Sequence, residues 1–207
     1  MPKAVIFLGP SLEPSVAREV LDATYLPPIK RGDLAKLDQA VQTVGIVDGE
    51  FFQSLAVSPK EVLVLLDRGV KVFGSSSIGA LRAAELHTLG MVGVGRVFEM
   101  YRDGRIEADD EVALLYDPIT YRACSEPLVN IRCALDAAVL KNVVGRIKAD
   151  EILSRLVELY FPYRTHRAVG LLCPELEEFM RSLPSNQKRD DALLLLEMIA
   201  AGEARRD

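Results

Sequence analysis

Short apolar runs alternate with amphipathic segments over the first 92 residues, and this alternation constrains the fold more than any other feature. Residues 3–8, 44–47 and 70–73 are apolar runs of strand length, and each is followed by a glycine-containing turn. The stretches between them carry apolar residues at helical spacing, most clearly at 60–68. The pattern predicts an α/β fold with a small, mostly parallel sheet flanked by helices.

The rest of the chain has the periodicity of helices rather than strands. A length of 207 residues is typical of one domain, or of one domain with an extension. We therefore predict a core α/β domain over residues 1–144 and a helical C-terminal extension, packed on that core, over 145–207. The expected helices span residues 94–102, 129–140, 149–159, 175–183 and 190–201.

Composition excludes several classes of function. The net charge of -5 provides no basic field for nucleic acid, and no stretch is apolar enough to span a bilayer or to act as a signal peptide. Three cysteines without a C-x-x-C pair are typical of the reducing cytoplasm. Two histidines are too few for a zinc cluster, so we expect no metal and no cofactor.

Loops that leave parallel strands gather at the carboxyl edge of the sheet, where ligands bind in such folds. Three loops qualify here, at residues 9–11, 48–52 and 74–79, and each contains glycine. In the third loop, Ser75 and Gly79 stand two positions before and after Ser77, which is the spacing of a nucleophile elbow. Ser77 would then begin the following helix, where the Ile78 N–H could bind an oxyanion. Helix capping by these serines is the simpler interpretation, and phosphate binding is another.

A serine nucleophile needs a base, and with few histidines a lysine is the natural candidate. Lys60 would begin a helix that runs back toward the start of the third strand, so it could reach the same edge as Ser77. Asp48 could orient Lys60 or a water molecule, although aspartate is also common at turns. Arg82 could bind a carboxylate, or pair with Glu85 along one helix face.

Several segments resemble the TfuA-like family over residues 3 to about 140. Ser75 and Ile78 stand where alanine and methionine are common in that family. The matching segments are Gly9-Pro10-Ser11, Gly45-Ile46-Val47-Asp48-Gly49-x-Phe51, Pro59-Lys60-Glu61-Val62-Leu63, Gly74-x-Ser76-Ser77-Ile78-Gly79-Ala80-Leu81-Arg82-Ala83-Ala84-Glu85-Leu86, Gly90-Met91-x-Gly93-x-Gly95, Asp109-Asp110-Glu111-Val112-Ala113 and Ser125-Glu126-Pro127-Leu128-Val129-Asn130-x-Arg132.

The resemblance implies a partner of YcaO enzymes, which replace the oxygen of a peptide backbone amide with sulfur to give a thioamide. It further implies release of sulfide from a thiocarboxylated, ubiquitin-like (ThiS-like) sulfur carrier, and help for YcaO in holding its peptide. A hydrolase-like Ser-Lys pair of this family would correspond to Ser77, with Ser76 as the alternative nucleophile, and Lys60. The residues expected at the oxyanion and the substrate are Ile78, Gly79, Gly9, Ser11, Gly49 and Arg82.

Two other functions remain open. A non-catalytic adaptor would dock on YcaO and position its peptide or carrier, and it would depend little on the elbow serines. A small nucleotide-binding domain would use the loop at 74–79 on phosphate, but that loop lacks the G-x-x-x-x-G-K-[ST] pattern.

Overall fold

The computed structural model describes residues 4–51 and 54–204, and the chain forms two compact units. The first unit comprises Met1–Glu107 together with Lys188–Asp207, and the second comprises Ala108–Gln187. The boundary expected after residue 144 lies inside the second unit, and the last helix of the chain belongs to the first unit. In the described residues no helix is both long and apolar enough to cross a membrane.

The first unit is built on a five-stranded, wholly parallel sheet with the order β2-β1-β3-β4-β5, which confirms the α/β fold. The two edge strands, β2 and β5, were not expected, because three residues are too few to show a strand period. The order of the strands reverses between β1 and β3, and such a switch point is the usual ligand site of these sheets. The strands are β1 (Ala4–Phe7), β2 (Thr24–Leu26), β3 (Thr43–Ile46), β4 (Lys71–Ser75) and β5 (Val92–Val94).

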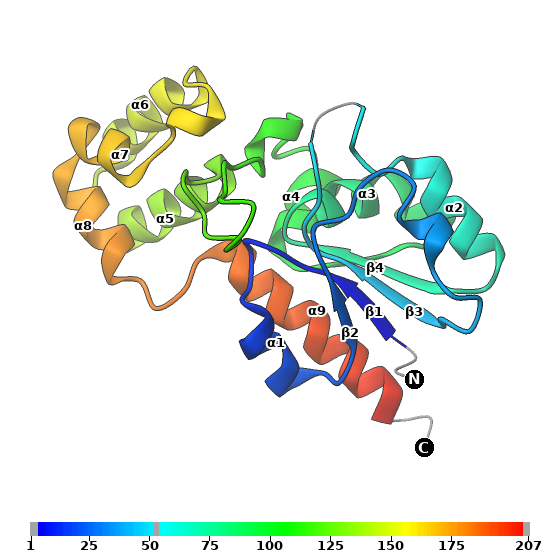
Figure 1. Ribbon diagram of the computed structural model, residues 1–207. Coiled ribbons are helices and arrows are strands. Elements are labelled where there is room, and N and C mark those ends of the chain that lie inside the picture. The colour runs from blue at the N-terminus through cyan, green and yellow to red at the C-terminus, as the bar shows by residue number, and fades with distance from the viewer. Residues whose placement is uncertain (1–3, 52–53, 205–207) are drawn as a thin grey trace. The chain divides into compact units, whose positions relative to one another are not determined.

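Helices cover both faces of this sheet (Figure 1). On one face lie α1 (Pro14–Val20) and α9 (Gln187–Ala204), and on the other lie α2 (Pro59–Asp67) and α3 (Ile78–Leu86). The helix α4 (Arg96–Arg102) packs against α3. Between β2 and β3 the chain makes a 3-10 turn, Leu34–Lys36, at whose start Asp33 makes no side-chain cap.

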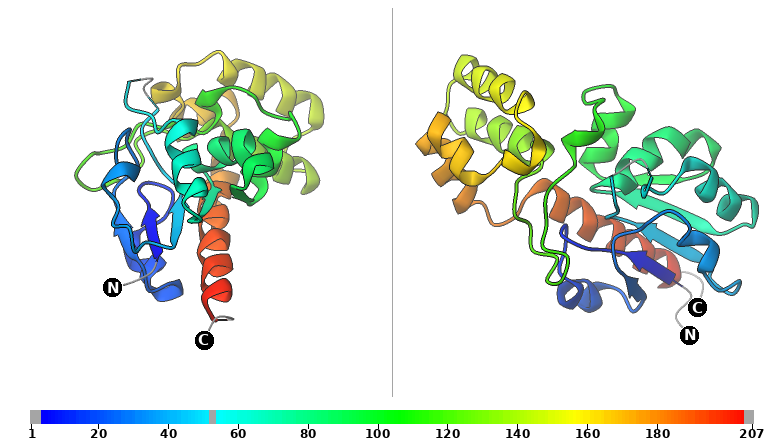
Figure 2. Two further views of the ribbon diagram at one scale, coloured as in Figure 1. Left: turned by 90° about the vertical axis from the view of Figure 1, so that its right-hand side faces the viewer. Right: turned by 45° about the horizontal axis from the view of Figure 1, so that its top comes forward.

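The C-terminal helix α9 presents a continuous buried stripe to the sheet. Its apolar members pack with Ala4 and Ile6 of β1, and Figure 2 shows the helix running beside that strand. Lys188 and Asp191 extend the stripe at helical spacing, each only 2% exposed. A helix with this stripe brings two buried polar side chains to the carboxyl edge of the sheet. The apolar members of the stripe are Ala192, Leu195, Leu196 and Ile199.

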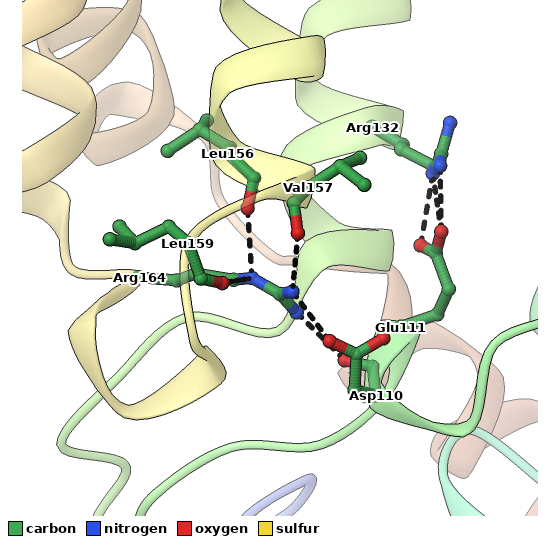
Figure 3. A network of polar contacts seen from close by, with 7 residues as sticks. All are labelled: Asp110, Glu111, Arg132, Leu156, Val157, Leu159 and Arg164. Carbon is green, nitrogen blue, oxygen red and sulfur yellow. Dashed lines mark hydrogen bonds and ion pairs between the residues drawn. The ribbon is translucent and has the colours of Figure 1, made fainter.

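The second unit is helical and has its own apolar core, which includes Ile131, Ile152 and Leu176. Within it, the buried guanidinium of Arg164 donates to the carbonyl groups of Leu156, Leu159, Val157 and Asp110, and it pairs with the Asp110 carboxylate at 2.6 Å (Figure 3). Beside it, Arg132 pairs with Glu111. The helices of this unit are α5 (Leu128–Leu140), α6 (Arg146–Val157), α7 (His166–Leu172) and α8 (Pro174–Ser182).

Candidate active site

The end of β4, the start of α3 and the turn between them, which together we call the elbow (residues 74–79), bend tightly over the carboxyl edge of the sheet. Gly74 and Gly79 permit this turn, since a Cβ on Gly79 would lie 1.8 Å from the Ile46 carbonyl oxygen and one on Gly74 would lie 2.2 Å from the Gly79 oxygen. Ser76 has a φ of 67°, a left-handed conformation that is unfavourable for a residue with a side chain. Ser77 immediately precedes the first residue of α3.

All three elbow serines are buried, and they differ in their hydrogen bonds. The Oγ atom of Ser75 has no hydrogen-bond partner among the described residues. Ser76 Oγ donates to the backbone carbonyl of Lys188 at 2.8 Å. Ser77 Oγ accepts a hydrogen bond from Nζ of the same lysine at 3.1 Å. Neither Ser76 nor Ser77 caps α3 with its side chain, so the simpler capping interpretation does not account for them.

Asp48 lies on the other side of the lysine, directly after β3. Its Oδ1 atom is 4.0 Å from Lys188 Nζ, and both side chains are almost fully buried. The carboxylate also accepts hydrogen bonds from Gly9 N–H at 2.9 Å, Ser11 N–H at 3.0 Å and Ser11 Oγ at 2.6 Å. Asp48 thus joins the loops that follow β1 and β3, at the switch point of the sheet.

These contacts align Ser77, Lys188 and Asp48 in one buried row. Burial and the positive end of a helix favour the neutral form of a lysine, whereas a neighbouring carboxylate favours the ammonium. Lys188, in the first turn of α9 and 4.0 Å from Asp48, experiences all three effects. A neutral amine in this position can accept the proton of the Ser77 hydroxyl.

Lys60, the base expected from the sequence, lies elsewhere. It is the second residue of α2, its side chain is exposed, and no contact within the described residues joins it to Ser77. The buried face of α2 contains Val62, and a residue two positions away projects roughly 200° around a helix, toward solvent. Lys60 therefore shares the first unit with Ser77 but faces away from its core.

The start of α2 is otherwise as expected. Ser58 caps the helix, Pro59 is its first residue, and Glu61 completes a capping box. Burial alone would raise the pKa of the Glu61 carboxyl, but hydrogen bonds from the N–H groups of Ser58 and Gly32 outweigh that effect and lower it. This corner is thus stabilised by the capping box and by the hydrogen bond from Gly32 N–H to Glu61.

The backbone groups expected at an oxyanion are mostly engaged. Gly9 and Ser11 bind Asp48, and Gly79 N–H donates to the Val47 carbonyl at 3.4 Å. Gly49 is bridged to Ile29 by bonds of its two neighbours, the Asp48 carbonyl and the Glu50 N–H, so the bridge does not use the Gly49 N–H. Next to Ser77, Ile78 is the donor with the most suitable position. Ile78 is the first residue of α3, and the first N–H groups of a helix have no intrahelical partner.

Arg82 is also held within the chain. Its Nε donates to the Val57 carbonyl at 2.8 Å, and its guanidinium pairs with both oxygens of Glu85 at 2.7 Å. The expected pairing along α3 is therefore confirmed, and binding a substrate carboxylate would require Arg82 to leave Glu85. Of the three expected loops, the last residue of the second one, Phe52, lies outside the described residues.

Comparison with known proteins identifies the family of the chain. The family model for TfuA-like proteins matches residues 48–165, which is more than half of the chain. The chain belongs to the TfuA-like family. Membership of this family supports a role beside a YcaO enzyme in thioamide formation. A search of curated proteins found no match. Within the described residues of this TfuA-like protein, no cluster of histidine, cysteine and carboxylate side chains could hold a metal ion.

The matched segment contains Asp48, Lys60 and the elbow but ends before Lys188, the lysine that contacts Ser77. Sequence reasoning missed this lysine of the TfuA-like chain because its helix follows the elbow by more than a hundred residues. A signal was present, since Lys188 lies on the apolar stripe of α9, in the helix's first turn. That position is electrostatically unfavourable for a cation, which is the argument that drew attention to Lys60.

Proposed function

We propose that this protein hydrolyses a thiocarboxylated, ubiquitin-like sulfur carrier and supplies the sulfide to a YcaO enzyme. Ser77 is the nucleophile, Lys188 the general base, and Asp48 the residue that orients the lysine. The observation that carries the proposal is the 3.1 Å hydrogen bond between Lys188 Nζ and Ser77 Oγ. A nucleophile and a base within hydrogen-bond reach, with a third group orienting the base, are the requirements of covalent acyl transfer.

The first chemical step forms an acyl-enzyme. Neutral Lys188 accepts the proton of the Ser77 hydroxyl while Oγ attacks the thiocarboxylate carbon. Negative charge develops on the substrate oxygen, where the Ile78 N–H at the start of α3 can donate a hydrogen bond. The carbon–sulfur bond then breaks, the sulfur takes the proton from Lys188, and hydrosulfide leaves.

The second step restores the enzyme. Water attacks the ester carbon as Lys188 accepts its proton, and the carrier departs with an ordinary carboxylate. Ser77 recovers its proton from the lysine, so that the overall reaction converts a thiocarboxylate and water into a carboxylate and hydrogen sulfide. Ser77 is 2% exposed in the described state, so the carrier's C-terminal tail must displace groups that cover it.

The experiment is sulfide release from a thiocarboxylated carrier, measured without YcaO. We expect Ser77→Ala and Lys188→Ala each to lower kcat by a factor of roughly 10³ or more, the scale of losing a nucleophile or its base. Lys60→Ala is the matched control, because Lys60 is also a lysine in the first turn of a helix but is exposed. Wild-type rates for both site variants, or loss of activity in Lys60→Ala alone, would reject the assignment.

A non-catalytic adaptor is the second candidate, and one observation favours it. In the second unit Tyr160 and Tyr163 are 58% and 66% exposed, although their rings contact each other with centroids 6.2 Å apart. Clustered, exposed aromatic side chains are typical of protein interfaces. An adaptor would use such a surface to dock on YcaO.

The two functions are separated by one pair of variants. Tyr160→Ser with Tyr163→Ser should weaken capture by immobilised YcaO if the aromatic surface docks there, while sulfide release without YcaO stays at the wild-type rate. Ser77→Ala should have the opposite effects. A protein that supports thioamidation fully with Ser77→Ala, but not with the tyrosine variants, is an adaptor.

A further inference from the structure

The first turn of α9 is held at three points around Lys188. Ser77 binds the lysine side chain, and Ser76, the preceding residue, binds its backbone carbonyl at 2.8 Å. One turn later the Asp191 carboxylate accepts hydrogen bonds from Arg96 N–H at 3.0 Å and Val97 N–H at 2.7 Å, at the start of α4. Two adjacent elbow residues thus hold the two ends of one lysine.

The conformation of Ser76 indicates that its side chain is used. A φ of 67° costs a residue with a Cβ about 1–2 kcal/mol, and glycine adopts it without that cost. The chain has glycine at both ends of the elbow, Gly74 and Gly79, but serine at the strained position. The hydroxyl of this serine is fully buried and reaches a backbone group 112 residues away in sequence.

Position matters for the base, because a shift of about 1 Å in a reacting group can lower a rate by about 100-fold. A lysine side chain has four rotatable bonds, so a hydrogen bond to the amine alone fixes the position of the side chain poorly. The bond from Ser76 fixes the backbone end of this side chain as well, and the anchor and the nucleophile are consecutive residues. Asp191 further limits rotation of α9 about its axis.

We propose that Ser76 is a positioning residue: its hydroxyl anchors the backbone of Lys188 so that the amine stays aligned with Ser77. The inference rests on the proposed function for its catalytic consequence, but the anchoring itself is a property of the folded chain. Ser76, the alternative nucleophile expected from the sequence, thereby acquires a different role. Its hydroxyl donates its hydrogen bond to the carbonyl of Lys188 rather than to a substrate.

The test is Ser76→Gly, which removes the hydroxyl and also relieves the left-handed φ. We expect kcat for sulfide release to fall by about 10–100-fold with KM changed less than about twofold, and the limb of the pH–rate profile that reports the lysine to move. The melting temperature should stay the same or rise. The matched control is Asn142→Gly, which relieves a φ of 57° in the second unit and should leave the kinetics and the pH profile unchanged.

A second measurement does not depend on activity. The rate at which an amine-reactive reagent acetylates Lys188, followed by peptide mass spectrometry, should rise at least tenfold in Ser76→Gly and stay constant in Asn142→Gly. Equal labelling of Lys188 in Ser76→Gly and in the wild type overturns the inference. So does an unchanged pH profile with wild-type kcat. If Lys188 is labelled faster in Ser76→Gly but the wild-type protein releases no sulfide, the anchoring role of Ser76 is upheld and the hydrolase proposal is rejected.

Discussion

The carboxylate of Asp48 offers the sharpest test of how the switch point is held together. The substitution Asp48→Asn keeps the shape of the side chain but removes its charge. Three donors face this group, two backbone N–H groups and the Ser11 hydroxyl, at 2.6 to 3.0 Å. An asparagine can keep the two N–H bonds with its oxygen, and its amide nitrogen can donate to Ser11 Oγ instead.

The expected loss follows from these three bonds. A hydrogen bond to a charged acceptor contributes about 1.5–3 kcal/mol and a neutral one about 0.5–1.5 kcal/mol, a difference of about 1 kcal/mol for each bond. Over three bonds the free energy of unfolding should therefore fall by about 3 kcal/mol. Lys188, whose Nζ is 4.0 Å from Asp48 Oδ1, adds to this loss to the extent that it is charged.

The measurement is urea denaturation at pH 7, followed by far-UV circular dichroism because the chain contains no tryptophan. Asp33→Asn is the matched control, since the Asp33 side chain is partly exposed and pairs with the exposed Lys36. That substitution should change the free energy of unfolding by less than about 1 kcal/mol. If Asp48→Asn is no more destabilising than Asp33→Asn, the carboxylate does not hold the two loops together and the reasoning is wrong.

Three further predictions concern stability. Gly79→Ala should destabilise the first unit by about 3 kcal/mol or more in urea, since the new Cβ would lie 1.8 Å from the Ile46 carbonyl oxygen. Arg164→Met should destabilise the second unit by about 3–5 kcal/mol in the same assay, because it leaves a buried site without the guanidinium that five acceptors share. The hydrogen bond to Glu126 raises the pKa of His166. The stabilisation from this pair is therefore complete below about pH 6.5 and is lost as the pH rises through the folded-state pKa of His166. Melting temperatures measured between pH 6 and pH 9 should show this loss, and Glu126→Gln should make them less dependent on pH.

The two substitutions that test packing each have a control within the chain. Gly202→Ala, in α9 with no atom within 4 Å of the new Cβ, should stabilise by about 0.5–1 kcal/mol. Arg181→Met removes an exposed pair with Glu177 and should cost at most about 0.5 kcal/mol. Similar effects in a test variant and its control would contradict the packing argument for that site. A pH dependence that persists in Glu126→Gln would assign it to another group.

Much of the first unit was predictable because its signals are local. The three longer strands are apolar runs that end at glycine turns, and the start of α2 follows from Ser58, Pro59 and Glu61 within four residues. The edge strands were missed because a strand of three residues is too short to show an alternation of apolar and polar residues. The helix expected from residue 94 instead begins at Arg96, since β5 occupies Val92–Val94 and Asp191, far along the chain, caps the helix at its start.

The candidate site was only partly predictable. The elbow and its serines follow from small residues at fixed spacing, and Asp48 follows from its position after a buried strand. The prediction that Lys60 meets Ser77 chose the correct edge of the sheet. It did not take into account the rotation of α2 about its axis, which turns the Lys60 side chain to solvent. Rotation of a helix about its axis depends on which of its residues find buried partners, and those partners come from other elements.

The parallel sheet, the edge at which its loops gather and the serines placed there can all be predicted from the sequence, because each depends on residues close together in the chain. The identity of the lysine beside Ser77 depends instead on how distant elements pack. In the sequence the second unit interrupts the first, and α9 buries its apolar stripe against the sheet of the first unit. Burial of that stripe carries Lys188 to the elbow, a contact that local patterns alone do not encode.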